Sequence, residues 1–213
     1  MHLIDLSHTL SSSMPVYPGT EPPEFTYPCQ IDEVGFNETL MRFYSHTGTH
    51  LDAPAHILRG GRRLDEISID RFVGRCRILD LRGIGKSVIE IRDLEARPLD
   101  LDKNGFVLLN TGWYRMWGKG AYFTGYPTLS VQAAEWLAGF ELKGLGIDAI
   151  SVDAEGSASF PVHKIFLERD ILIIENLTNL DSLPNEKIIF SCLPLKIEAG
   201  EGSPVRAVGI LCH

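Results

Sequence analysis

The run Ile171-Leu-Ile-Ile-Glu175-Asn-Leu177 is the clearest indication of fold class in the chain. Four successive aliphatic residues are typical of a strand buried on both faces. The run ends on Glu175, and a carboxylate at the tip of a buried strand is costly unless it is paired or ligated. The stretch therefore predicts a sheet interior that ends at a polar site, although Glu175 could instead cap a loop.

Outward from this run, short segments rich in Ile, Leu, Val or Phe predict further strands. Two helices are expected, one opened by a capping box in Ser87-Val-Ile-Glu90 and running to about Ala96, the other capped by Ser130 and running to Phe140. Strands outnumber helices, so the sequence predicts a mixed α/β fold dominated by sheet. The further predicted strands are 3–7, 38–45, 75–81, 106–110, 145–152, 187–193 and 205–211.

Composition bounds the class of protein. The chain has 213 residues, of which 44% are hydrophobic and 23% charged, with no repeat or linker, and this predicts one globular domain over residues 1–213. The net charge is -8 and no basic run is longer than Arg62-Arg63, so neither a nucleic-acid nor a membrane partner is expected. Without a secretory signal or a run of ~18 apolar residues, the sequence predicts a cytoplasmic protein.

The spacing of the cysteines argues against two kinds of structural feature. They lie far apart, without a Cys-x-x-Cys pair, which argues against a disulfide framework and against a cysteine zinc site. Two of them fall in apolar, strand-like runs and are expected to be buried free thiols. The four are Cys29, Cys76, Cys192 and Cys212, with Cys76 and Cys192 in the apolar runs.

Three of the seven histidines fall within the segment His46-Thr-Gly-Thr-His50-Leu-Asp52-Ala-Pro54-Ala-His56. Imidazole nitrogen and carboxylate oxygen are ligands that suit zinc, manganese or iron. Further ligands must come from elsewhere, and the candidates are Glu175 and His163, which could also be a solvated loop histidine. The segment therefore predicts a metal site.

Local geometry limits how this segment can bind an ion. In an extended strand His46 and His50 would stand ~13 Å apart, at ~3.3 Å per residue, whereas metal–nitrogen bonds are only ~2 Å long. Gly48 and Pro54 disfavour a helix. We therefore expect a bent loop after the 38–45 strand, in which Gly48 takes an unusual φ.

The histidine segment resembles the signature of the cyclase-type metal-dependent hydrolases, which include bacterial kynurenine formamidases and isatin hydrolases. Individually weaker matches follow in order along nearly the whole chain. They are Asp5-Leu-Ser-His8-Thr-Leu, Pro15-Val-Tyr-Pro18-Gly19, Asn110-Thr-Gly-Trp113, Gly146-Ile-Asp148, Ser151-Val-Asp153, Glu175-Asn-Leu177, Pro194-Leu-Lys196 and Gly202-Ser-Pro204-Val-Arg206-Ala.

The resemblance implies a swivelling β/β/α domain, assembled as a homodimer or larger oligomer. It implies one or two ions, zinc in the first place and manganese as the alternative. The first ion would be bound by His46, His50 and Asp52. Asp52 would bridge to a second ion, completed by His163 and Glu175, and His56 would be the proton donor and acceptor.

The implied activity is hydrolysis of a small amide by metal-bound hydroxide, with His56 as proton shuttle. An aryl formamide such as N-formylkynurenine, an intermediate of tryptophan catabolism, is the leading substrate. Residues 11–28 contain five prolines and are expected to form a surface loop. In this loop Tyr17 stands where kynurenine formamidases carry a substrate-contacting Trp, so Tyr17 is expected to bind the substrate and the identity of that substrate stays open.

Other functions are weighed against this one. An isatin-type lactam hydrolase, or a cyclase of another small cyclic substrate, is the alternative within the family. A mononuclear iron oxygenase could use His46, His50 and a carboxylate as its triad. A metal-binding module without turnover would have no need of His56. A serine hydrolase is disfavoured because no Gly-x-Ser-x-Gly is present.

Overall fold

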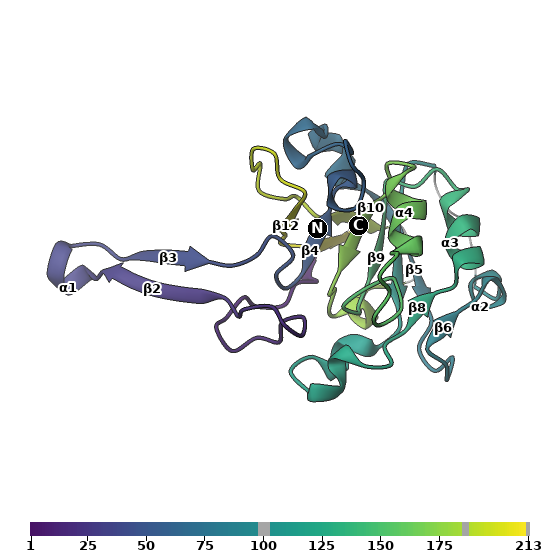
Figure 1. The fold of residues 1–213 in the computed structure, drawn as a ribbon, viewed down its shortest axis with the longest axis horizontal. Helices are drawn as coiled ribbons and strands as arrows, with labels where there is room; N and C mark the ends of the chain where they lie inside the picture. Colours follow the sequence, from purple (N-terminus) through teal and green to yellow (C-terminus); the bar gives the residue numbers. More distant parts are fainter. Residues whose placement is uncertain (98–102, 185–187, 212–213) are drawn as a thin grey trace.

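The computed structural model describes residues 1–97, 103–184 and 188–211, and its largest element is a curled nine-stranded sheet (Figure 1). The four central strands β5, β7, β9 and β10 are parallel, and the flanking strands are antiparallel. In spatial order the sheet consists of β1 (His2–Asp5), β13 (Val208–Leu211), β11 (Ile188–Ser191), β5 (Val73–Asp80), β7 (Phe106–Asn110), β9 (Gly144–Ile147), β10 (Leu172–Glu175), β4 (His50–Asp52) and β12 (Gly202–Pro204).

Helices cover one face of this sheet, and the two faces carry separate apolar clusters. The helices are α2 (Ile91–Glu95), α3 (Val131–Ala138) and α4 (Pro161–Leu167). Strand β10 alternates between the clusters, because Ile173 packs with residues of α3 and α4 whereas Leu172 and Ile174 pack on the other face. Short 3-10 turns join the elements: η1 (Pro54–His56), η2 (Leu64–Glu66), η3 (Ile69–Phe72), η4 (Trp113–Met116), η5 (Gly120–Phe123) and η6 (Leu180–Ser182).

A long hairpin arm projects from this body (Figure 1). It consists of β2 (Glu24–Cys29) and β3 (Glu38–Arg42), which pair only with each other and are joined through α1 (Ile31–Val34). No residue of the arm is buried within the chain. A second pair, β6 (Val88–Ile89) and β8 (Thr128–Leu129), is parallel and lies beside the main sheet.

The predicted sheet-dominated α/β class is confirmed. Each predicted strand corresponds to an observed one, in most cases shorter, and residue 187 of the 187–193 segment lies outside the described residues. Ser130 caps its helix as predicted, because its Oγ accepts a hydrogen bond from the Ala133 amide at 3.1 Å. Cys76 and Cys192 are free and buried, also as predicted, while Cys212 lies outside the described residues.

Two local predictions are wrong. The helix expected over 87–96 is shorter, because Val88 and Ile89 find strand partners in Thr128 and Leu129 and form β6. The helix begins only at Ile91, behind a capping box made by Glu90 and Asp93. The loop expected over 11–28 ends at residue 23, since β2 finds its partner in β3.

A membrane-spanning helix is not found: among the described residues, no helix is long and apolar enough to cross a bilayer.

Candidate metal centre

Strands β4 and β10 bring three of the predicted ligands together. The two strands are antiparallel, and their register pairs His50 with Glu175. Alternation along β4 places His50 and Asp52 on one face, while Leu51 between them packs into the opposite apolar cluster. His50 Nε2 lies 3.5 Å from both Asp52 Oδ1 and Glu175 Oε2. The three side chains are almost completely buried, which is unusual for polar groups without ligands.

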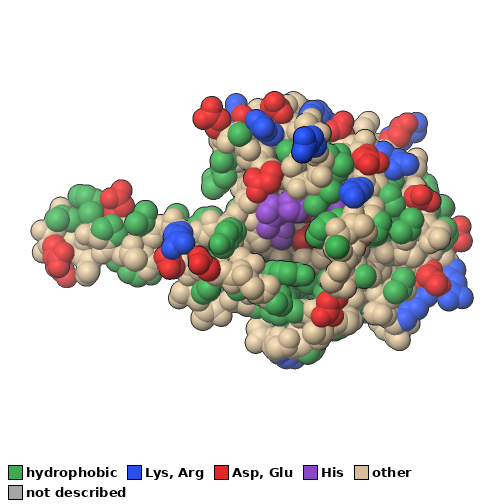
Figure 2. Space-filling model, in the orientation of Figure 1, with side chains coloured by type: hydrophobic (Ala, Val, Ile, Leu, Met, Phe, Trp, Pro, Cys, Tyr) green, Lys and Arg blue, Asp and Glu red, His purple; other side chains and the backbone are tan. Residues whose placement is uncertain are grey.

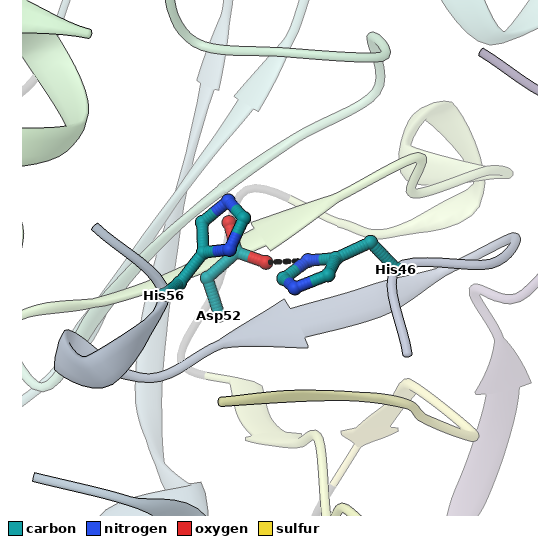
Figure 3. A group of neighbouring side chains, drawn as sticks. All are labelled: His46, Asp52 and His56. Carbon is teal, nitrogen blue, oxygen red and sulfur yellow. Dashed lines mark hydrogen bonds and ion pairs between the residues drawn. The ribbon is translucent and has the colours of Figure 1, made fainter. Parts of the chain in front are cut away.

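His46 reaches the same point because the chain bends before β4. Gly48 has the positive φ of +66° that the sequence predicts, and a Cβ there would lie 2.6 Å from the Leu10 side chain. His46 Nδ1 lies 2.7 Å from Asp52 Oδ1, and Figure 3 shows the two side chains pointing toward each other with His56 alongside. On its other side, His46 Nε2 is 3.4 Å from Glu201 Oε1.

His163 enters from α4, and Asp153 orients it. The Asp153 carboxylate accepts hydrogen bonds from the His163 backbone amide at 3.0 Å and from the Val162 amide at 2.9 Å. It also lies 2.7 Å from His163 Nδ1, which must carry the proton because an ionised carboxylate can only accept. His163 Nε2 is thereby turned toward Asp52 Oδ2 at 3.6 Å and Glu175 Oε1 at 3.4 Å. Such carboxylate–histidine pairs typically orient metal ligands.

A second buried network orients His50. The Gly48 carbonyl accepts hydrogen bonds from His50 Nδ1 and Asn176 Nδ2, both at 2.8 Å. The Tyr122 hydroxyl donates to Asn176 Oδ1 at 2.6 Å. With Nδ1 bound to a carbonyl, His50 Nε2 is free to face the two carboxylates as a ligand.

The structure therefore brings the predicted site residues to one place, where Asp52 Oδ1 faces His46 and His50 and Asp52 Oδ2 faces His163. His46, Asp52 and His56 form one set whose ligand atoms lie within 4.8 Å of one another, and His50, Asp52 and Glu175 form another. Asp52 is shared by both sets, as a bridging ligand would be. His56, the predicted proton shuttle, lies with its ring centroid 3.9 Å from that of His46, close enough to contact an ion.

The charges of the site explain its protonation. Burial alone would raise the pKa of Asp52, but the imidazoles of His46, His163 and His50 around it hold that pKa well below its usual range. Burial lowers the pKa of His50, yet the carboxylates of Glu175 and Asp52 outweigh this and raise it to about 9. Without an ion, the neighbouring carboxylates therefore favour the protonated forms of His50 and His163, whose pKa values are raised.

The residues fit a divalent cation. Two buried atoms, Asp52 Oδ2 and His46 Nε2, have no hydrogen-bond partner within the described part of the chain. Buried polar atoms without a hydrogen bond are rare and indicate a missing ligand, and the contacts of these two atoms with Glu201 and His163, at 3.4 and 3.6 Å, are longer than ordinary hydrogen bonds. Nitrogen and carboxylate oxygen without sulfur form a donor set suited to zinc or manganese.

The cluster opens into a cavity of about 470 Å³. Its floor includes His46, His50, His56 and His163, and Figure 2 shows histidine side chains in a hollow of this face. Residues of the proline-rich loop, including Tyr17, line the same cavity.

Sequence reasoning missed the roles of four orienting residues, namely Asp153, Asn176, Tyr122 and Glu201. Asp153 and Asn176 lie inside segments that resemble the family, but nothing in a single sequence assigns them a partner. Glu201 reaches His46 because the start of β12 lies close to the His46 ring. A Cβ on the first residue of β12, Gly202, would lie only 2.5 Å from that ring, so the close approach requires glycine. The glycine is the only local signal of that approach.

Comparisons with known proteins find relatives that match nearly the whole chain. A kynurenine formamidase of Salinibacter ruber is 32% identical over 210 residues, covering 98% of this chain and 97% of the relative. A kynurenine formamidase of Erythrobacter litoralis is 31% identical over 208 residues, covering 96% and 91%.

Solved structures show the same fold. Isatin hydrolase A from Ralstonia solanacearum has a TM-score of 0.87 at 28% identity, covering 98% of this chain and 91% of that one. An isatin hydrolase bound to the product analogue thioisatinate has a TM-score of 0.89 at 24% identity, covering 99% and 92%. The Cyclase family model matches residues 4–154, well over half of the chain. This chain belongs to the Cyclase family of metal-dependent hydrolases.

Proposed function

We propose that this protein hydrolyses a small aryl formamide, with N-formylkynurenine as the first candidate, and so acts in tryptophan catabolism. The observation that carries the proposal is the convergence of five ligand side chains and His56 at one cavity, which all of them except the fully buried Asp52 line. Relatives covering nearly the whole chain are named kynurenine formamidase. We propose zinc as the ion, with manganese as the alternative, held by His46, His50, Asp52, His163 and Glu175.

The chain's own residues supply the rest of the chemistry. A bound divalent ion would lower the pKa of a water molecule and polarise the amide carbonyl. Burial lowers the pKa of His56, so at neutral pH this imidazole is uncharged and can accept a proton. From the cavity floor it can pass that proton to the departing amine. The carboxylate of Asp153 keeps His163 in the tautomer that a ligand needs.

A second candidate is ring opening of a cyclic amide. Isatin hydrolase A from Ralstonia solanacearum matches at 28% identity over nearly the whole chain, which supports a lactam substrate. Both reactions attack an amide carbonyl beside an aromatic ring, so the same residues would serve either one.

An activity screen decides between these functions. The protein, stripped of metal and reloaded with Zn²⁺ or Mn²⁺, is offered N-formylkynurenine, formanilide and isatin. We expect metal-dependent release of formate from the two formamides, faster than ring opening of isatin, and none from the stripped protein. No hydrolysis of any substrate by fully loaded protein would contradict an amide hydrolase. Turnover only with Fe²⁺, air and a cosubstrate would indicate an oxygenase.

The predicted single domain, homodimer and cytoplasmic location remain predictions. Sedimentation velocity at micromolar concentration tests the assembly, and a single cooperative unfolding transition would support one domain.

A further inference from the structure

Phe160 has a backbone conformation that a bulky side chain rarely adopts. Its φ and ψ are 48° and 54°, in the left-handed region that favours glycine. It also directly precedes Pro161, and the residue before a proline is normally extended. Backbone strain of this kind persists only where the surroundings impose it, and it gathers at functional sites.

The start of helix α4 does not require a phenylalanine here. Phe160 occupies the N-cap position but makes no capping hydrogen bond with its side chain. Asp153 caps the helix instead, by accepting from the amides of Val162 and His163. Within the described part of the chain, Phe160 takes part in the helix through its backbone carbonyl, which accepts a hydrogen bond from the Lys164 amide as the carbonyl of any residue could. Glycine or asparagine would fit this backbone with less strain.

The ring of Phe160 faces the candidate site. It lines the cavity, and its centroid lies 5.8 Å from that of His163 at an interplanar angle of 86°. The side chain is 39% exposed, although it is large and apolar. Tyr17 and Tyr44 line the same cavity and are 51% and 53% exposed. Three uncovered aromatic rings thus surround the polar floor.

We propose that Phe160 is a specificity-determining residue whose ring contacts the aromatic ring of the substrate, so that the site prefers aryl amides to alkyl amides of equal size. The inference rests on the proposed amide hydrolysis and assigns the substrate class to one side chain. Aromatic pairs are favoured over aromatic–alkyl contacts when they stack offset or meet edge to face. On this proposal, the strained backbone of Phe160 is retained because it places the ring where it contacts the substrate.

Two formamides of the same connectivity test the assignment: formanilide has a flat aromatic ring, and N-cyclohexylformamide a puckered alkyl ring. In Phe160→Leu we expect KM for formanilide to rise about 5-fold, the value that an aromatic pair of about 1 kcal/mol implies, with kcat within about twofold. KM for N-cyclohexylformamide should stay within about twofold of wild type. Phe36→Leu, an exposed phenylalanine of the arm, is the matched control and should change neither KM.

A second variant separates specificity from stability. Phe160→Gly removes the ring and also the strain, so it should unfold at the same temperature as wild type or higher while losing the preference for formanilide. A purely structural role predicts the reverse, a lower unfolding temperature with the preference retained. If wild type cleaves both amides and Phe160→Leu shifts both KM values equally or not at all, the role of Phe160 is refuted and amide hydrolysis stands. If wild type cleaves neither amide, the role of Phe160 is refuted, and amide hydrolysis itself fails only if N-formylkynurenine and isatin are not hydrolysed either.

Discussion

Two antiparallel strand pairs, β4 with β10 and β2 with β3, distribute their side chains in opposite ways. Every residue of β4 is buried, although two of its three residues are His50 and Asp52. Every residue of β3 is exposed, although it includes Leu40 at 64% and Met41 at 56%. Buried polar groups and exposed large apolar groups are the informative exceptions in a folded chain. Strand pairing alone therefore does not decide burial.

The place of each strand pair in the fold determines whether its side chains are buried. Strands β4 and β10 lie between β12 and β9 inside the nine-stranded sheet, and apolar clusters pack on both faces of β10, so buried polar side chains there must have partners. The arm has only its own two strands, and such a hairpin is marginally stable in water. Its ion pairs from Arg42 to Glu21 and Glu24 are exposed and contribute little. The four predictions that follow test this contrast.

The largest effect is expected from Asp52→Asn. Asp52 is shared by both candidate ligand sets, and an amide cannot supply the negative charge that holds the cation. We expect loss of bound metal and roughly a 10³-fold fall in kcat/KM, the size of several kcal/mol of transition-state stabilisation. Elemental analysis and steady-state kinetics measure both. Asp32→Asn, at an exposed carboxylate of the arm, is the control and should retain both. An Asp52→Asn protein with full metal content would remove Asp52 from the site.

The second-largest effect is expected on the free energy of unfolding, which should respond differently to substitutions in the two strand pairs. Leu51→Ala removes a fully buried side chain between two site residues and should lower the free energy of unfolding by about 3 kcal/mol. Leu40→Ala on the arm should change it by no more than about 0.5 kcal/mol. Urea denaturation of the metal-free proteins measures both values. Equal losses would mean that the side chains of the arm are packed in solution.

A smaller effect is expected from His56→Ala. If His56 moves the proton, the variant retains its metal and loses turnover by about 10²-fold. Metal content and kcat are measured on the same preparation. Loss of metal would instead make His56 a ligand alongside His46 and Asp52, with which it forms one set.

The smallest effect is expected from His8. This histidine lies outside the arm and belongs to neither of the two candidate metal-binding groups. Its ring stacks on Trp117 with centroids 3.8 Å apart, and burial lowers its pKa from 6.5 to about 4. The unfolded chain therefore binds this proton more tightly than the folded one. The folded state therefore has its full stability above about pH 6.5, where His8 is neutral in both states. It loses stability as the pH falls toward 4, because the unfolded chain takes up the proton first.

His8→Phe keeps the stack and removes the titrating group. Between pH 7 and pH 5, wild type should lose on the order of 1 kcal/mol more stability than this variant, after allowance for partial exposure. Urea denaturation at both pH values gives the difference. Parallel losses in the two proteins would show that His8 does not titrate in this range.

Local sequence determined the elements whose signals lie within one turn or one strand. The apolar run ending at Glu175 became β10, Ser130 capped α3, and the bend at Gly48 followed from the spacing of His46 and His50. These features depend on neighbouring residues, whose preferences a single sequence displays directly. The ligand types of the site were likewise visible in the sequence.

Only the tertiary structure decided which residues meet. The register that sets His50 opposite Glu175 joins positions far apart in the chain, and the orienting roles of Asp153 and Glu201 depend on where a helix and an edge strand come to lie. Val88 and Ile89 formed a strand because a partner was within reach, and Asp153, rather than the N-cap residue Phe160, capped helix α4. Local preference is worth little free energy per residue, so contacts between distant segments override it.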